Sequence, residues 1–120
     1  VNLNLMSFKF PLPALVSIAH RISGVLMFIL MPVILFILSK LLAGGSVNVT
    51  ILYFSHFPIM LKLLAWVMLV ATLYHTLAGL RHLFMDMGYG ESFVAANRSA
   101  IVIFVLLIVI LVATGVWLWA

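Results

Sequence analysis

Three long apolar runs limit how this chain of 120 residues can fold. They cover residues 22–43, 57 to about 80, and 100–120. A helix needs about 20 predominantly apolar residues to cross the hydrocarbon core of a bilayer, and each run reaches that length. Only 7% of the residues are charged, whereas an ordinary soluble domain carries about 25%. The sequence therefore predicts an all-α integral membrane protein with three transmembrane helices, embedded in a lipid bilayer.

Proline and glycine residues set the predicted bounds of these helices. Pro11 and Pro13 favour an extended lead-in followed by a helix, and Gly44 with Gly45 ends that helix. Pro32 predicts a kink within it, because proline removes one backbone hydrogen bond. The predicted order, in a single membrane-anchor domain, is a lead-in (1–13), a first helix (14–43), an outer loop (44–57), a second helix (58–87), an inner loop (88–98) and a third helix (99–120).

The few cations predict a topology, and the composition excludes several functions. Four of the six Lys and Arg residues fall on the side of the N-terminus, so the positive-inside rule places the N-terminus in the cytoplasm and the C-terminus outside. A net charge of +4 is too sparse to indicate nucleic-acid binding. Because cysteine is absent, this chain can hold no disulfide and no cysteine-bound iron–sulfur cluster. The absence of an internal repeat and of a charged pathway argues against a small transporter. The four cations are Lys9, Arg21, Arg81 and Arg98, and the two on the other side are Lys40 and Lys62.

A polar stripe crosses the second apolar run. His75, Gly79, His82 and Asp86 are spaced so that they share one narrow face of a helix, whereas Arg81 points elsewhere. A charged side chain at the centre of a membrane helix costs roughly 2.5–3.5 kcal/mol on insertion scales, and such groups usually face protein or a cavity. We therefore expect a cofactor or a partner to cover the stripe.

Histidine is the ligand type that this chain can offer to a metal, and His75 is the best placed. It lies about 10 Å deeper than His82, from seven residues at 1.5 Å each, and a neutral imidazole there could ligate haem iron. His75 and His82 share a helix face, so they cannot bind opposite sides of one iron. If the helix ends are level, His20 and Arg21 lie beside His82 and Asp86, too shallow to oppose His75. A second ligand would come from another polypeptide or be absent, and the chain would then be a subunit.

Simpler interpretations of the stripe remain open. His75 could make an interhelical hydrogen bond to a serine, a threonine or a backbone carbonyl. Gly79 could admit a flat macrocycle, and His82 is better suited to a structural role or to contact with haem propionates than to iron ligation. Asp86 is most simply paired with Arg21 or Arg81, with proton transfer as the lesser alternative. His56, in the predicted outer loop, is interpreted as an ordinary surface residue.

A second polar segment begins the first helix. Ser17, Arg21 and Gly24 share a face through their i, i+4, i+7 spacing. The segment could be a boundary whose arginine reaches lipid headgroups. Alternatively, a hydroxyl and a cation at the membrane edge could hydrogen-bond the carbonyls of an amphipathic ligand such as a quinone.

Together these segments resemble the cytochrome b subunits of succinate dehydrogenase, one of the two membrane anchors of respiratory complex II. The motifs are S-x-x-H-R-x-S-G at Ser17–Gly24 and H-x-x-x-G-x-R-H-x-x-x-D-x-G at His75–Gly88. The resemblance implies a three-helix anchor that pairs with a second small anchor, holds one haem b between them, and docks a flavoprotein and an iron–sulfur subunit. It further implies electron transfer from succinate to ubiquinone, with succinate oxidised on the flavoprotein, in a bacterial inner membrane rather than a mitochondrial one.

The same resemblance assigns roles to individual residues. His75 matches the axial haem ligand, and the partner anchor supplies the other histidine. Ser17 and Arg21 match the ubiquinone site, whereas His20 and Arg21, with His82, match the region of the haem propionates. Two alternatives use similar parts: the anchor of a fumarate reductase, and a purely structural anchor without a redox role.

Overall fold

The computed structural model describes residues 12–43 and 58–120, which form three helices. They are α1 (Leu12–Ala43), α3 (Ile59–Asp86) and α4 (Phe93–Trp119). Each is long and apolar enough to cross a membrane, and the described residues contain no strand. The predicted all-α fold with three membrane-length helices is confirmed. Most of the predicted lead-in, and the predicted outer loop with His56, lie outside the described residues.

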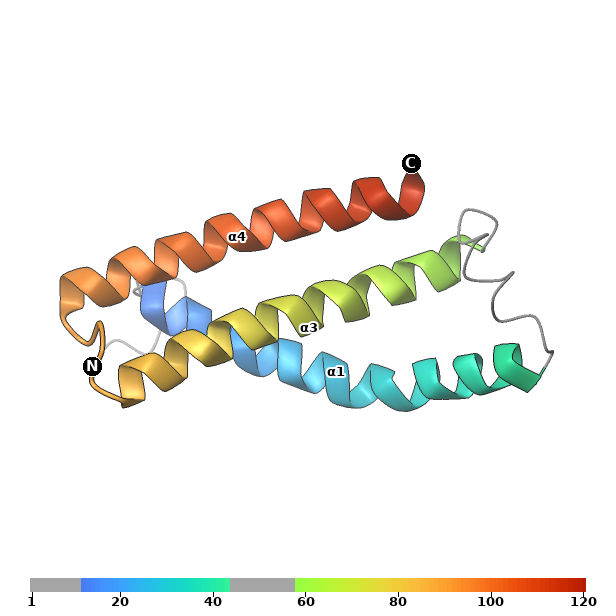
Figure 1. Ribbon diagram of the computed structural model, residues 1–120, viewed down its shortest axis with the longest axis horizontal. Coiled ribbons are helices and arrows are strands. Elements are labelled where there is room, and N and C mark those ends of the chain that lie inside the picture. Colours follow the sequence, from blue (N-terminus) through green and yellow to red (C-terminus); the bar gives the residue numbers. More distant parts are fainter. Residues whose placement is uncertain (1–11, 44–57) are drawn as a thin grey trace, which may run out of the picture.

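Consecutive helices run antiparallel, with α3 beside both of its neighbours (Figure 1). The start of α1, the end of α3 and the start of α4 gather at one end of the bundle, and the C-terminus lies towards the other end (Figure 1). The first of these ends carries the polar residues of both sequence motifs. It corresponds to the inner side in the predicted topology.

The third helix begins six residues earlier than predicted, at Phe93 rather than at residue 99. Ser92 caps it, because its hydroxyl accepts a 3.2 Å hydrogen bond from the backbone N–H of Ala95. Serine is among the preferred N-cap residues because its oxygen satisfies an N–H group that has no partner within the helix. The predicted inner loop over 88–98 was therefore too long.

The connection that remains between α3 and α4 is a tight turn. Gly88 and Gly90 adopt positive φ angles of 93° and 68°, a conformation that glycine adopts without a steric penalty. These glycines end α3 close to its predicted limit. The start of α1 was also misplaced, because α1 begins at Leu12, two residues before the predicted start.

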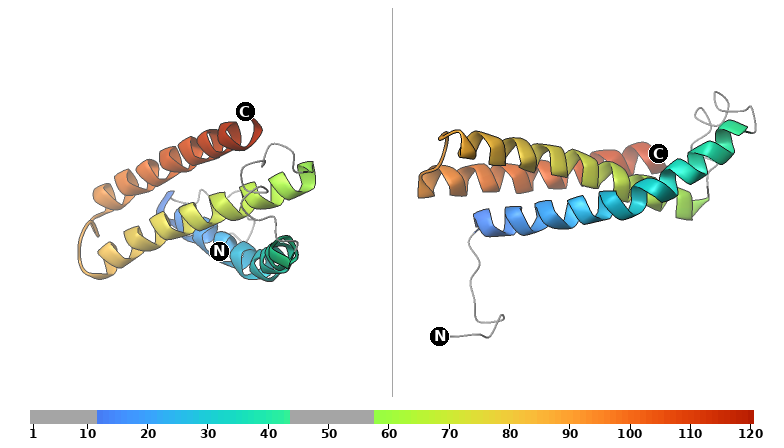
Figure 2. Two further views of the ribbon diagram at one scale, coloured as in Figure 1. Left: turned by 45° about the vertical axis from the view of Figure 1, so that its right-hand side comes forward. Right: turned by 90° about the horizontal axis from the view of Figure 1, so that it is seen from below.

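Pro32 lies within α1, which continues on both sides of it. The right-hand view in Figure 2 shows α1 bending, so that its second half departs from the direction of its first half. A proline in a helix interior removes a hydrogen bond and crowds the preceding turn, which produces such a bend. The first half of α1 is therefore the part that packs along the polar end of α3.

A small core joins the three helices near their polar end. Tyr74 is 3% exposed, and its hydroxyl donates a 3.0 Å hydrogen bond to the backbone carbonyl of Val16. Alanines at the helix contacts let the backbones approach closely, as is common in membrane bundles. This core fixes α1 against α3 beside the two motifs. Its buried members are Val16, Tyr74, Ala78, Ala100 and Ile103.

Aromatic residues join α3 to α4 at the opposite end. The indole N–H of Trp66 donates a 2.9 Å hydrogen bond to the Thr114 hydroxyl. The Trp66 ring packs edge-on against Trp119, with 5.7 Å between the ring centroids and 83° between the ring planes. The Lys62 ammonium lies 6.0 Å from the centroid of the Trp119 ring. This arrangement is typical of a membrane–water interface, where amphipathic rings and snorkelling lysines gather.

Candidate functional site: His75 and the polar end of the bundle

The imidazole of His75 is held by the backbone and one side chain of α1. Its Nδ1 lies 3.0 Å from the Ser23 hydroxyl oxygen and 3.1 Å from the carbonyl oxygen of His20. The Ser23 hydroxyl donates to the same carbonyl at 2.7 Å. The interhelical hydrogen bond that the sequence left open as an alternative is therefore present.

These contacts determine which ring nitrogen of His75 carries the proton. A carbonyl oxygen can only accept, and the single hydroxyl proton of Ser23 is already donated to that carbonyl. Both neighbours of Nδ1 therefore act as acceptors, and Nδ1 carries the hydrogen. In a neutral imidazole this leaves Nε2 unprotonated, and within the described part of the chain Nε2 makes no hydrogen bond. The lone pair of Nε2 is available to a ligand.

His20 lies against His75 rather than at a shallower level. The two imidazoles stack with 4.0 Å between centroids and 11° between ring planes. The predicted depth of His20, too shallow to oppose His75, was wrong. It assumed that the ends of the first two spans are level, but the contacts with His75 and Gly79 set His20 about one to two turns deeper on α3.

The stacked rings still cannot hold one metal between them. The lone pair of an imidazole nitrogen lies in the plane of its ring, so two nearly parallel rings direct their lone pairs alongside one another. Opposite axial ligands must instead point at each other across the iron. His20 and His75 therefore cannot bind opposite sides of one iron, and the reason is the orientation of the rings rather than their depth.

Each stacked ring lies against a glycine of the opposite helix. A Cβ atom on Gly24 of α1 would lie 3.1 Å from Cε1 of His75, and a Cβ on Gly79 of α3 would lie 3.3 Å from Nε2 of His20. Both distances are shorter than ordinary van der Waals contact between carbon or nitrogen atoms. The two glycines make room for the imidazole pair. Gly79 also lines the groove beside the pair, where the sequence indicated that it could admit a flat macrocycle.

A groove of about 370 Å³ runs beside this pair on the outer face of α3. Its lining combines leucine and glycine with three imidazoles. A haem is a flat, largely apolar macrocycle, so one side of its pocket needs apolar walls and one unprotonated nitrogen to bind the iron. His75 offers that nitrogen. The residues present therefore fit one side of a haem. The groove is lined by His20, His75, Thr76, Gly79, Leu80, His82 and Leu83.

A second hollow, the polar niche, lies between α1 and α3 at the end of the bundle and measures about 210 Å³. It brings together Ser17 and Arg21 from the first motif with Arg81 and His82 from the second. Three of the predicted residues, His20 among them, thus share one niche with His82. A hydroxyl and guanidinium groups around a small hollow can donate hydrogen bonds to carbonyl or carboxylate oxygens. The niche is lined by Val16, Ser17, His20, Arg21, Ala78, Arg81 and His82.

Arg81 and Asp86 have partners other than those predicted. The Nε of Arg81 donates to the Ser99 hydroxyl at 2.9 Å, and its Nη2 donates to the Ala96 carbonyl at 3.1 Å, so this arginine ties α3 to α4. Asp86 lies 3.5 Å from Nε2 of His82 on its own helix, and both side chains are more than 60% exposed. The predicted pairing of Asp86 with Arg21 or Arg81 was wrong, because the i, i+4 neighbour is closer.

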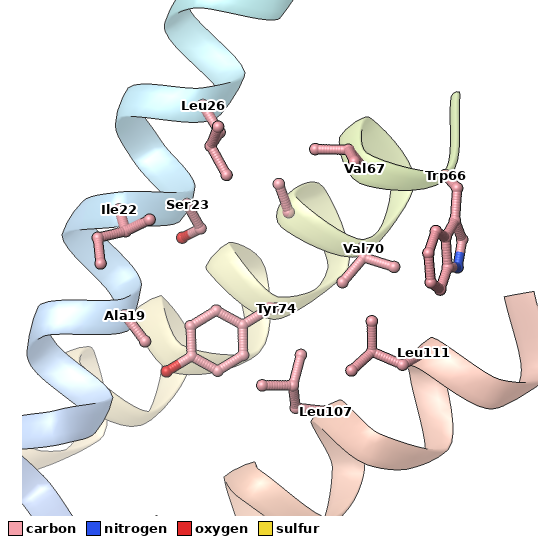
Figure 3. Close-up of a pocket in the computed structure, with 11 residues that line it drawn as sticks. Ala19, Ile22, Ser23, Leu26, Trp66, Val67, Val70, Tyr74, Leu107 and Leu111 are labelled. Carbon is pink, nitrogen blue, oxygen red and sulfur yellow. The ribbon is translucent and has the colours of Figure 1, made fainter. Parts of the chain in front are cut away.

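An apolar cavity of about 290 Å³ lies between the three helices on the other side of Ser23 (Figure 3). The side chains of Tyr74, Val70 and Trp66 border it from α3, and those of Leu107 and Leu111 border it from α4 (Figure 3). Ser23 is therefore placed between this cavity and the His75 ring.

Ser23 lies within the first motif, and the sequence alone predicted no role for it. Its signal was its position three residues after His20, where a helical serine can bond the carbonyl that also faces the opposite helix. The sequence likewise predicted no role for Tyr74, which precedes His75 and is the buried link between α3 and the backbone of α1.

Comparison with known proteins places these features in a family. The chain matches the succinate dehydrogenase/fumarate reductase transmembrane subunit family over residues 1–115. It is 41% identical, over 123 residues, to the succinate dehydrogenase cytochrome b556 subunit of Coxiella burnetii (strain RSA 493 / Nine Mile phase I). That match covers 99% of this chain and 95% of the relative. The chain therefore belongs to the family of succinate dehydrogenase/fumarate reductase transmembrane subunits.

Proposed function

We propose that this chain is the cytochrome b-type anchor of a succinate:ubiquinone oxidoreductase, where it helps to bind haem b and ubiquinone. The observation that carries the proposal is the state of His75. Its Nδ1 is engaged by two acceptors, and its Nε2 is free beside an apolar groove. Histidines that bind metals usually donate their other N–H to a carbonyl or a similar acceptor, which fixes the tautomer and the ring orientation.

In this proposal His75 would hold the iron of haem b from this chain, and a histidine of the second small anchor subunit would hold it from the other polypeptide. Haem b, when bound, supplies a one-electron carrier. The chain's own contribution is to hold His75 in a single tautomer and to present positive or hydrogen-bonding groups to the propionates. His20 and His82 line the groove, and Arg21 lies in the adjoining polar niche.

Ubiquinone is proposed to bind at the polar niche as the electron acceptor. Ser17 and Arg21 can each donate a hydrogen bond to a quinone carbonyl, which becomes more basic as the ring is reduced. Stronger bonds to the reduced form favour reduction. Succinate itself would be oxidised on the flavoprotein, and electrons would reach the niche through the iron–sulfur subunit.

Assembly and location follow from the same proposal. The polar end of the bundle would carry the iron–sulfur and flavoprotein subunits on the cytoplasmic side of a bacterial inner membrane. The C-terminal end, with its tryptophans, would face the periplasm.

The haem assignment is tested with a His75→Ala variant of the assembled complex. We expect the b-type optical spectrum to be lost or to show changed axial ligation, because the variant lacks the imidazole whose Nδ1 is held by α1 and whose Nε2 is left for the iron. Mass analysis of the purified complex checks that both anchors are still present. Unaltered axial ligation in a fully assembled variant would exclude His75.

The quinone assignment is tested with Ser17→Ala and Arg21→Leu. Both should reduce quinone turnover, with losses of about 10-fold or more for a removed donor, while succinate oxidation by a soluble dye continues. The dye assay serves as the control for assembly, since it needs the peripheral subunits but not the niche. Normal quinone kinetics in both variants would remove these residues from the proposal.

Two alternative functions make different predictions. The anchor of a fumarate reductase would be coupled to a quinone of lower potential and a flavoprotein poised for the reverse reaction. A purely structural anchor would yield a complex that lacks haem and retains full quinone activity.

A further inference from the structure

Ser23 differs in its burial from the other polar residues that the structure describes. It is 4% exposed and is the one buried polar residue among residues 12–43 and 58–120. A serine that only bonds the carbonyl three residues back needs no burial, because the same bond forms on an exposed helix face, as it does at Ser39. The hydroxyl of Ser23 instead lies between the His20 carbonyl and the Nδ1 of His75.

We propose that Ser23 is a positioning residue for His75, which fixes the ring orientation and tunes the donor strength of Nε2 towards a bound haem. This inference rests on the proposed function, since it takes His75 as the axial ligand. The resemblance to succinate dehydrogenase anchors assigned roles to other residues of this motif and none to this serine.

Three contacts from α1 orient the His75 ring. The edge carrying Nδ1 is bonded by Ser23 and by the His20 carbonyl, and the face is covered by the stacked His20 imidazole. A half-turn of the ring would place a carbon where Nδ1 now lies, and both hydrogen bonds would be lost. Nε2 is therefore kept towards the groove.

The hydrogen bonds also act on the electrons of the ring. An acceptor at Nδ1–H increases the basicity of the other nitrogen, and a more basic ligand favours the ferric over the ferrous state. Because Ser23 donates its proton to the His20 carbonyl, its oxygen is polarised and accepts more strongly. Loss of this hydroxyl should therefore raise the reduction potential of the haem while the carbonyl still holds the tautomer.

The chain offers a matched pair of variants for the test. Ser23 borders the apolar cavity of about 290 Å³, so the additional methyl group of a larger β-branched residue has room there. Ser23→Thr keeps the hydroxyl, and a helical threonine can still bond the carbonyl three or four residues back. Ser23→Val has nearly the same shape without the hydroxyl.

The experiment is a potentiometric titration of the haem in the purified complex, followed optically, with electron paramagnetic resonance of the oxidised haem. We expect Ser23→Val to raise the potential, alter the resonance and weaken haem retention in detergent by about 10-fold, the lower end for outer-shell partners. Ser23→Thr should match the natural protein. If Ser23→Val does not assemble, Ser23→Ala is measured in its place with the same expectation.

Several results would overturn the role of Ser23. Equal potentials in the valine and natural proteins, a lowered potential in the valine protein, or equal shifts in the valine and threonine proteins would each do so. These outcomes are distinguishable from failure of the proposed function. If the proposed function failed, the natural complex would lack a b-type haem, or His75→Ala would leave the haem ligation intact.

Discussion

At the scale of single residues, the candidate site depends on side chains packed at very short range. Gly24 and Gly79 each accommodate an imidazole from the opposite helix, and both belong to the motifs read from the sequence. The stacked histidines could not lie between α1 and α3 if either position carried a β-carbon in the present arrangement. The two glycines therefore help to position the His75 ring.

Gly24→Ala is expected to displace His75 and reduce haem binding. The new Cβ would lie 3.1 Å from Cε1 of His75, so the ring must move by a few tenths of an ångström and its hydrogen bonds to α1 lengthen. We expect several-fold lower haem content per complex, measured by optical absorbance against protein mass. The matched control is Gly115→Ala, whose Cβ would lie at an ordinary 3.7 Å from Trp66 and which should keep its haem. Equal haem content in both variants would contradict this account.

The sequence predicted which residues form the site better than it predicted how they contact one another. Helical spacing placed His75 and His82 on one face, and both line the same groove. The stack of His20 on His75 could not be predicted, because it depends on how far α1 slides along α3. That offset is set by packing around Val16 and Tyr74, which no periodicity within one helix records.

At the scale of helices, α3 is tied to α4 at both ends by different chemistry. Arg81 bonds Ser99 and Ala96 at the polar end, and Trp66 bonds Thr114 at the aromatic end. Interhelical hydrogen bonds in membrane bundles contribute about 0.6 kcal/mol on average in double-mutant cycles. Several such bonds are needed to hold helices whose apolar faces pack as well against lipid as against each other.

Trp66→Phe and Thr114→Val should destabilise the complex by overlapping rather than additive amounts. Each substitution removes the same hydrogen bond and should lower the stability by about 0.5–1.5 kcal/mol. The double variant should therefore lose less stability than the sum of the two single losses. Thermal inactivation of succinate-linked quinone reduction, which needs the intact anchor, measures this in the assembled complex. Strict additivity would show that the 2.9 Å contact contributes no coupling.

The three helices themselves could be predicted because apolar length is a strong signal, whereas their ends could not all be. The start of α4 was misplaced since Arg98 and Asn97 were taken for loop residues, although Ser92 already supplies the cap. A cap of this kind depends on the geometry of one turn. Composition over a window does not reveal it.

At the scale of the whole molecule, large apolar side chains remain exposed on all three helices. Phe28 of α1 is 83% exposed and Ile108 of α4 is 61% exposed, far more than a folded chain leaves to water. These faces suit lipid and the helices of partner subunits. The groove beside His75 is likewise open on one side, so its completion by a second anchor would bury both the imidazole pair and the apolar wall.

The orientation of the whole bundle can be tested because the chain has no cysteine. Glu91 lies in the exposed turn at the polar end and Ala120 at the exposed opposite end, so single cysteines there report on the two sides. In intact bacterial cells, an impermeant thiol reagent should label Ala120→Cys and spare Glu91→Cys. Permeabilised cells should label both, which controls for shielding by other subunits.

The reason for the expected orientation is electrostatic: Arg81 and Arg98 lie near the Glu91 end, and positive charge is retained on the cytoplasmic side. Labelling of Glu91→Cys alone in intact cells would invert the topology and place the polar niche away from cytoplasmic succinate.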